Sequence, residues 1–188
     1  MGVDGAGQER LGNAFRMGWA NAGKPVDGWP DEMVLRALVV RAKQDWPDLE
    51  LDDEHFLRTV GHKASLSGPA DVPQWLQSLQ IGDLYLATGC AGGNERALGL
   101  FEQHFGPELN KLVARFRNQR YSREDMLQTW RERVLVADSD GKVRIAEYSG
   151  RGKLKNWVRV CSLRLFIDLY RKTKSQSDEV LPFSDWDW

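Results

Sequence analysis

Basic and aromatic side chains alternate along residues 148–174 in a pattern that could bind a polyanion. Six Lys and Arg lie between Lys153 and Lys172, on a segment that also carries Trp157 and Phe166. Arginine pairs with phosphate through a planar fork of donors, and a tryptophan ring can stack on an unpaired base. These residue types favour contact with single-stranded nucleic acid. The structural alternative is a helix whose tryptophan packs inside the protein and whose arginine stems cover apolar surface.

The charge of this stretch differs from that of the whole chain. The 188 residues have a formal net charge of -1, yet residues 142–174 hold ten Lys and Arg against two acids, Glu147 and Asp168. Acids gather instead in residues 27–60 and in residues 178–188. Because salt screens charges beyond about 8 Å under physiological conditions, such a local concentration indicates a local contact with phosphate. A well-solvated basic helix explains the charge equally well.

No constellation for catalysis or metal binding accompanies the basic stretch. The three histidines are dispersed, and neither the G-x-S-x-G nor the H-E-x-x-H pattern occurs. Cys90 and Cys161 have no second Cys or His at ligand spacing, and so few cysteines are typical of a reduced compartment. No apolar run approaches the ~18 residues of a membrane span. We therefore expect a soluble, cytoplasmic protein that is not an enzyme and uses no cofactor, metal or membrane.

The elements that position the basic stretch are predicted to be helices. Apolar residues recur at spacings of three and four almost throughout, and no run longer than about four residues alternates as a strand would. The expected helices cover residues 30–46, 53–63, 73–88, 95–116, 122–136 and 153–174. Pro107 is expected to kink or split the fourth of them. The chain is thus predicted to be all-α, with an N-terminal helical extension (residues 1–80) before a compact helical bundle (residues 81–176).

Projection of the helices at about 100° per residue separates their faces. The first helix is expected to turn inward an apolar face of Met33, Leu35, Leu38, Val39 and Ala42. The last helix has a core stripe of Leu154, Val158, Cys161, Leu165 and Leu169. A neighbouring stripe consists of Trp157, Val160, Arg164, Ile167 and Arg171. Because this second stripe mixes an aromatic ring with two guanidinium groups, it is the candidate binding face.

The same stretch resembles a known family. Residues 148–172 are similar to the part of bacterial sigma-70 family factors, particularly the extracytoplasmic-function type, that melts and reads the promoter minus-ten element. In that group a segment aromatic-x-G-R-G-x-aromatic-x-x-W-L leads into a helix ending D-L-L-R-R. This chain matches the register at Tyr148, Gly150, Arg151, Gly152, Leu154, Trp157, Val158, Asp168, Leu169, Arg171 and Lys172.

Two earlier blocks extend the resemblance over residues 83–174. Residues 124–128, with Arg133, are similar to the family's E-D-L-V-Q and downstream Arg, which dock on the clamp helices of the largest polymerase subunit. Residues 93–98, with Phe101 and Phe105, resemble the G-D-x-x-A-[FL] opening of its first conserved helix. The resemblance implies a bundle like sigma factor region 2.

The resemblance also implies two binding sites. Core RNA polymerase would be bound by Asp125, Gln128, Thr129, Glu132 and Arg133. Promoter DNA, especially the single-stranded minus-ten region, would be bound by Arg151, Lys153, Lys155, Trp157, Val160, Arg164, Arg171 and Lys172. The expected function is that of a sigma factor-like transcription initiation protein.

Several departures from the family pattern support an alternative function. Thr129 stands where Glu is usual, Val160 and Leu163 replace commonly basic residues, and Arg164 replaces a common Asn. Only 14 residues follow Lys174, too few for the helix-turn-helix domain that reads the minus-thirty-five element. The alternative is an interaction module that binds polymerase or an anti-sigma protein without opening promoters. An unrelated helical enzyme is a third and weaker reading.

The C-terminal segment, residues 177–188, is acidic and aromatic. We expect it to be the start of a linker toward a second domain. The alternative is a segment that folds over the basic helix and occupies its binding face in place of DNA.

Overall fold

The computed structural model describes residues 9–19, 28–116 and 121–174, without the side chains of the last three. In chain order its elements are α1 (Arg10–Trp19), α2 (Glu32–Gln44), α3 (Asp53–Ser67), α4 (Val72–Ser78), α5 (Ile81–Ala91), α6 (Glu95–Val113), α7 (Arg123–Leu135), a 3-10 helix η1 (Arg144–Glu147) and α8 (Leu154–Lys174). The regular structure of these ranges is helical apart from one antiparallel bridge between Ala137 and Val143, which confirms the all-α prediction. None of the helices placed in them is long and apolar enough to cross a membrane. The 177–188 segment lies outside the described residues.

Local caps determine where most helices begin. A side-chain oxygen of the residue before α2, α3, α4, α6 and α7 accepts a backbone N–H of the first turn, which would otherwise be unpaired. These caps are Asp31, Asp52, Asp71, Asn94 and Ser122. The helix starts predicted at residues 30–32, 52–53, 94–95 and 122 are confirmed.

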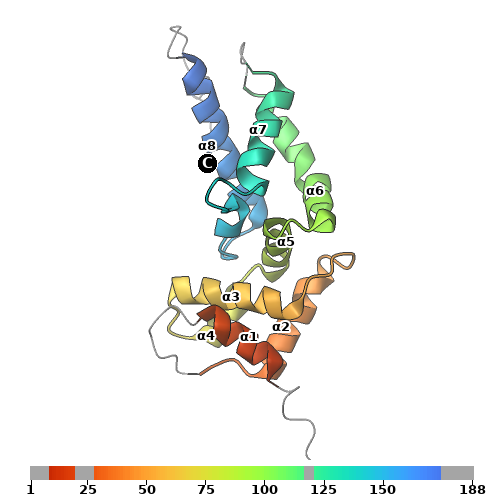
Figure 1. The fold of residues 1–188 in the computed structure, drawn as a ribbon, viewed down its shortest axis with the longest axis vertical. Helices are drawn as coiled ribbons and strands as arrows, with labels where there is room; N and C mark the ends of the chain where they lie inside the picture. The colour runs from red at the N-terminus through yellow and green to blue at the C-terminus, as the bar shows by residue number, and fades with distance from the viewer. Residues whose placement is uncertain (1–8, 20–27, 117–120, 175–188) are drawn as a thin grey trace, which may run out of the picture.

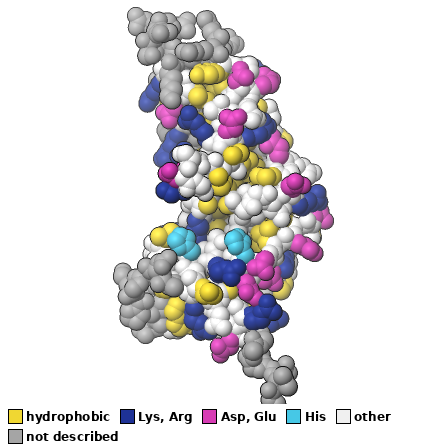
Figure 2. All heavy atoms as spheres, viewed as in Figure 1, with side chains coloured by type: hydrophobic (Ala, Val, Ile, Leu, Met, Phe, Trp, Pro, Cys, Tyr) yellow, Lys and Arg dark blue, Asp and Glu magenta, His cyan; other side chains and the backbone are white. Residues whose placement is uncertain are grey.

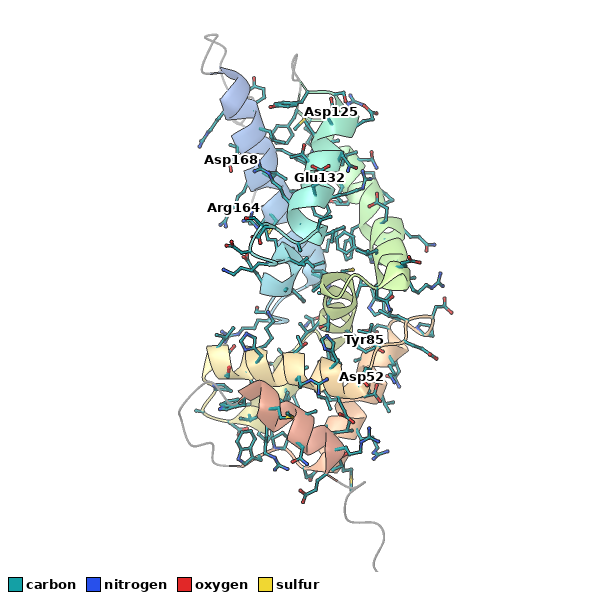
Figure 3. The ribbon with its side chains drawn as sticks, in the orientation of Figure 1. Asp52, Tyr85, Asp125, Glu132, Arg164 and Asp168 are labelled. Carbon is teal, nitrogen blue, oxygen red and sulfur yellow. The ribbon has the colours of Figure 1, made fainter. Side chains whose placement is uncertain are left out.

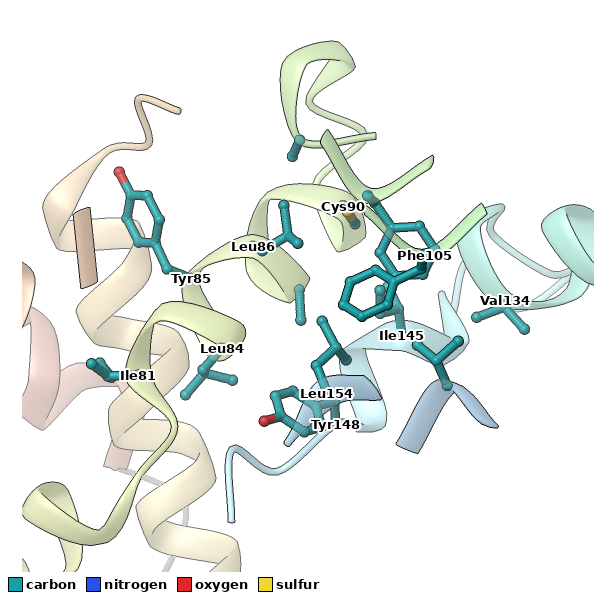
Figure 4. Close-up of a cluster of buried hydrophobic side chains, with 14 of the residues drawn as sticks. Ile81, Leu84, Tyr85, Leu86, Cys90, Phe105, Val134, Ile145, Tyr148 and Leu154 are labelled. Carbon is teal, nitrogen blue, oxygen red and sulfur yellow. The ribbon is translucent and has the colours of Figure 1, made fainter. Parts of the chain in front are cut away.

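Helix α5 joins two groups of helices. Figure 1 shows α1–α4 at one end of an elongated molecule and α6–α8 at the other, with α5 between them. On one side of α5 the Tyr85 ring meets Phe56 edge to face at 5.0 Å, and on the other side Cys90 lies beside Phe105 (Figure 4). The Tyr85 hydroxyl also accepts the Leu51 N–H at 2.9 Å. A single apolar core therefore runs through both groups.

Helix α1 is not among the expected helices, and it packs closely against α3. A Cβ on Gly18 would lie 2.0 Å from the Arg58 carbonyl oxygen, and one on Gly61 would lie 2.1 Å from that of Phe15. Only glycine allows the two backbones to approach so closely. Residues buried on α1, including Phe15, complete the core of this end of the molecule.

Two expectations about the helices are wrong, and one of the two alternatives in a third is excluded. Residues 73–88 do not form one helix, because the chain turns at Leu79 and Gln80, where the Gln80 N–H donates to the Gly150 carbonyl at 2.8 Å. Helix α6 continues through Pro107, so the predicted split does not occur, and the kink expected there stays a prediction. Met33 is 79% exposed and takes no part in the apolar face of α2, whose other four predicted members are buried.

Candidate functional site

Helix α8 is positioned by one buried stripe. Four of its five predicted core residues, Leu154, Val158, Leu165 and Leu169, are buried, and Cys161 is half-buried. The side of α8 that carries these residues packs against α6 and α7. Ser162 and Phe166 of α8 are also buried, and the charged side chains lie on the rest of the helix surface.

The start of α8 is held by α5. The Leu154 N–H donates to the Asp83 carboxylate at 2.7 Å, so a side chain from another helix satisfies one of the unpaired amides. Gly150 has φ +79°, and a Cβ there would press on Leu79 and Leu84 at 3.2 and 3.3 Å. The loop that carries Arg151 is therefore fastened to the junction of α4 and α5.

Tyr148 and Trp157 form an aromatic contact beneath this loop. Tyr148 is 2% exposed, its hydroxyl donates to the Gly152 carbonyl, and burial raises the pKa of its phenol. The half-buried Trp157 meets Tyr148 at 6.2 Å in a T-shaped arrangement. Trp157 thus packs partly inside the protein, as in the structural alternative, while part of its ring stays accessible.

The cations of the predicted DNA-binding set project into solvent. Arg151, Lys153, Lys155, Arg164 and Arg171 are exposed, and so is Val160 at 45%. Figure 3 shows Arg164 one turn from Asp168 on the outer side of α8, and Figure 2 shows Lys and Arg gathered along the same edge of the molecule. Lys172 lies in α8, but its side chain is outside the described part.

Few acids neutralise this surface. Lys155 lies 3.7 Å from Glu108 of α6. Over the described side chains, Arg151, Lys153, Arg164 and Arg171 form no salt bridge. Arg159, which belongs to the basic stretch but not to the predicted DNA-binding set, is also exposed, one turn after Lys155. Because residues four apart are neighbours on a helix surface, the position of Arg159 four residues after Lys155 was the signal that could have added it to the predicted site.

The predicted polymerase-binding residues lie on α7, opposite its buried side. Met126, Leu127, Trp130 and Val134 face the core, and Glu102 of α6 binds Arg131 through both carboxylate oxygens. The outer stripe consists of Asp125, Gln128, Thr129, Glu132 and Arg133, of which Thr129 is half-buried and the others exposed. All five share one side of the helix.

Three members of this α7 stripe, Asp125, Gln128 and Glu132, already have hydrogen-bond partners. The Asp125 carboxylate accepts the Ser122 N–H, and the Ser122 hydroxyl accepts the Asp125 N–H, both at 3.0 Å, so the two residues form a capping box. Gln128 donates to Glu132 at 3.0 Å. Figure 3 places Asp125 at the start of α7 and Glu132 farther along it. Asp125 therefore has a structural role in addition to any binding role.

The described residues show neither a metal-binding cluster nor a reactive thiol at the buried Cys90. They contain no group of three or more His, Cys, Asp or Glu placed to hold a metal ion. Burial raises the pKa of the Cys90 thiol to about 12, so its reactive thiolate is scarce.

No protein-family model, curated protein or solved structure matches this chain. The resemblance to sigma factors therefore depends on the motifs in residues 83–174.

Proposed function

We propose that this protein is a sigma factor-like transcription initiation protein. It binds core RNA polymerase through the outer stripe of α7, and it binds the promoter minus-ten region through α8 and the loop before it. The observation that carries the proposal is the set of solvent-facing cations, Arg151, Lys153, Arg164 and Arg171, that have no salt-bridge partner within the part of the chain that the structure describes.

The proposed mechanism is binding without catalysis by this chain. Lys and Arg neutralise phosphates and release their counterions, so affinity depends steeply on salt. The accessible part of Trp157, with the loop of residues 139–152, captures a base turned out of the non-template strand. Because α7 packs against α8, the polymerase and the opened DNA are held by neighbouring helices. RNA synthesis itself belongs to the polymerase.

Co-purification with core polymerase tests the α7 site. The informative variant is Gln128→Ala with Arg133→Glu, because Asp125 substitutions would also break the capping box. A matched control is Gln103→Ala with Lys111→Glu, which changes two exposed residues of α6. We expect the α7 variant to lose polymerase and the α6 variant to retain it. Equal recovery of both would refute docking through α7.

The packing of Trp157 also favours a second candidate, an interaction module that binds polymerase or an anti-sigma protein without opening promoters. Its ring is half-buried against Tyr148, and the neighbouring exposed position is the apolar Val160. Run-off transcription with core polymerase separates the two candidates. A promoter-dependent transcript supports the initiation protein, whereas polymerase binding without a transcript supports the module.

A further inference from the structure

A cavity of about 220 Å³ lies between α3, α5 and η1. Its walls are mostly apolar and include Leu84 of α5 and Ile145 and Tyr148 of the η1 region. The side chains of His55, Thr59 and Lys63 line it at intervals of four residues along α3. This spacing places them on one side of α3, so that side of the helix faces the cavity.

Lys63 is the buried cation of this cavity. Its side chain is 8% exposed, and its ammonium donates one hydrogen bond, to the Ala146 carbonyl, in the structure as described. An ammonium group has three N–H donors, so two remain for another acceptor. Burial lowers the pKa of Lys63, since the cavity walls solvate its charge poorly.

No carboxylate of the described residues lies within salt-bridge distance of Lys63. The acid whose charge acts on it is Glu147, which is exposed and lies 4.0 Å from Arg144. Buried charges in proteins are normally paired, because an unpaired one is strongly destabilising. Lys63 therefore lacks the counter-charge that its environment calls for.

We propose that the cavity between α3, α5 and η1 binds a small anionic molecule with an apolar body, such as an aliphatic monocarboxylate, whose carboxylate pairs with Lys63. The volume is below the roughly 300 Å³ at which pockets for drug-sized ligands begin, which limits the occupant to a small molecule. The apolar walls select its hydrocarbon part, and the buried ammonium selects its charge.

This site is connected to the start of α8. Ala146 and Tyr148 form part of the cavity wall, and Tyr148 contacts both Gly152 and Trp157. An occupant that draws Lys63 away from Ala146 changes the packing of this loop. The proposal stands on the cavity and Lys63 alone and does not depend on a role in transcription.

The test is an amide NMR titration of the full chain with sodium hexanoate. Hexan-1-ol, which lacks the charge, and acetate, which lacks the chain, serve as matched probes. We expect saturable shifts at residues 145–148 with hexanoate and binding at least tenfold weaker for both other probes. Lys63→Met should weaken hexanoate binding at least tenfold, whereas Lys111→Met, at an exposed lysine of α6, should not.

A second variant keeps the test decisive if Lys63→Met does not fold, which circular dichroism reports. Ala91→Leu retains Lys63 and fills the cavity from α5, where Ala91 is a half-buried lining residue. It should abolish the shifts caused by hexanoate. Absence of saturable hexanoate binding to the wild type, equal binding of hexanol, or unchanged binding in the folded variants would overturn the proposal.

Discussion

Individual residues of the sigma-like motifs divide between internal and external roles. Tyr148 and Gly150 are used inside the fold, one as a buried ring and the other as a backbone that approaches Leu79 and Leu84. Arg151 lies next to Gly150 in sequence, yet its side chain faces solvent. The internal residues fix the loop, so substitutions there would perturb any function indirectly. Only the external ones can report on binding.

Asp83 gives a prediction about pH. Burial raises the pKa of its carboxyl above the ordinary 3.8, with the Leu154 N–H opposing the shift. The folded protein then holds this proton more tightly than the unfolded chain, so the associated stability is complete below pH 3.8 and is lost as pH rises through the folded pKa. The wild type should therefore lose stability relative to Asp83→Asn as pH rises above 3.8. Urea unfolding at a series of pH values measures this difference, and a constant difference would contradict the assignment.

At the scale of helices, the sequence predicts what local chemistry determines. Asn94 and Ser122 cap α6 and α7 with their own side chains, so a short pattern is enough to locate both helix starts. By contrast, the break at Leu79 and Gln80 depends on a hydrogen bond to Gly150, seventy residues away. Helix α1 contains glycines that lower helix propensity, and it is stabilised by packing on α3 instead. The break has no local signal in the sequence, whereas α1 has one, because Leu11, Phe15 and Trp19 recur every four residues, as on one face of a helix.

The same distinction applies to the candidate site. Helical spacing was sufficient to place Arg164 and Arg171 on one side of α8, because that periodicity is intrinsic to the helix. It did not reveal that Asp83 of α5 holds the start of α8, nor that Lys63 of α3 reaches η1. Both contacts join segments distant in sequence, so no motif contains them.

The crossing of α1 and α3 yields a prediction about stability. Gly61→Ala places a methyl group against the Phe15 carbonyl, so the helices must separate, at a cost of about 1–3 kcal/mol. Gly99, inside α6, has nothing within 4 Å of its would-be Cβ, so Gly99→Ala should stabilise by roughly 0.4–1 kcal/mol. Chemical denaturation measures both. If Gly61→Ala and Gly99→Ala changed the free energy of unfolding in the same direction, the backbones of α1 and α3 would not be in contact at Gly61.

The capping box of α7 yields a second prediction about stability. Ser122→Ala removes the hydroxyl that accepts the Asp125 N–H and should lower the free energy of unfolding by about 1 kcal/mol. Ser139→Ala, at an exposed loop serine, is the control and should change it little. Denaturant titration distinguishes the two. A neutral Ser122→Ala would show that α7 begins without help from this hydroxyl.

Across the whole molecule, charge is segregated rather than balanced. Basic side chains gather along the edge formed by α8 (Figure 2), while residues 27–60, which include α2 and α3, hold nine acids against four bases. A polyanion that approaches α8 therefore meets attraction along one edge and repulsion at the other end. The distribution favours a defined orientation on DNA.

The salt dependence of DNA affinity tests this distribution. Each phosphate contact on a single strand contributes about 0.7 to the slope of log affinity against log salt. Arg164→Gln with Arg171→Gln should reduce the slope by about 1.4, because both contacts are lost. Arg36→Gln with Lys111→Gln removes the same charge from α2 and α6 and should leave the slope nearly unchanged. Fluorescence anisotropy of a labelled single strand measures it, and equal slopes for both pairs would exclude a contact specific to α8.

The position of α5 between the two helix groups predicts that the molecule unfolds as one unit. Cys90 is fully buried on α5, and burial raises the pKa of its thiol to about 12, so alkylation requires that the core open. In Cys161→Ser, where Cys90 is the remaining cysteine, alkylation by iodoacetamide should begin at the urea concentration where circular dichroism shows loss of helix. Cys90 lies on the side of α5 that faces Phe105 of α6 (Figure 4). Labelling at a clearly lower urea concentration would therefore show that α6–α8 separate from α5 while α1–α4 stay folded.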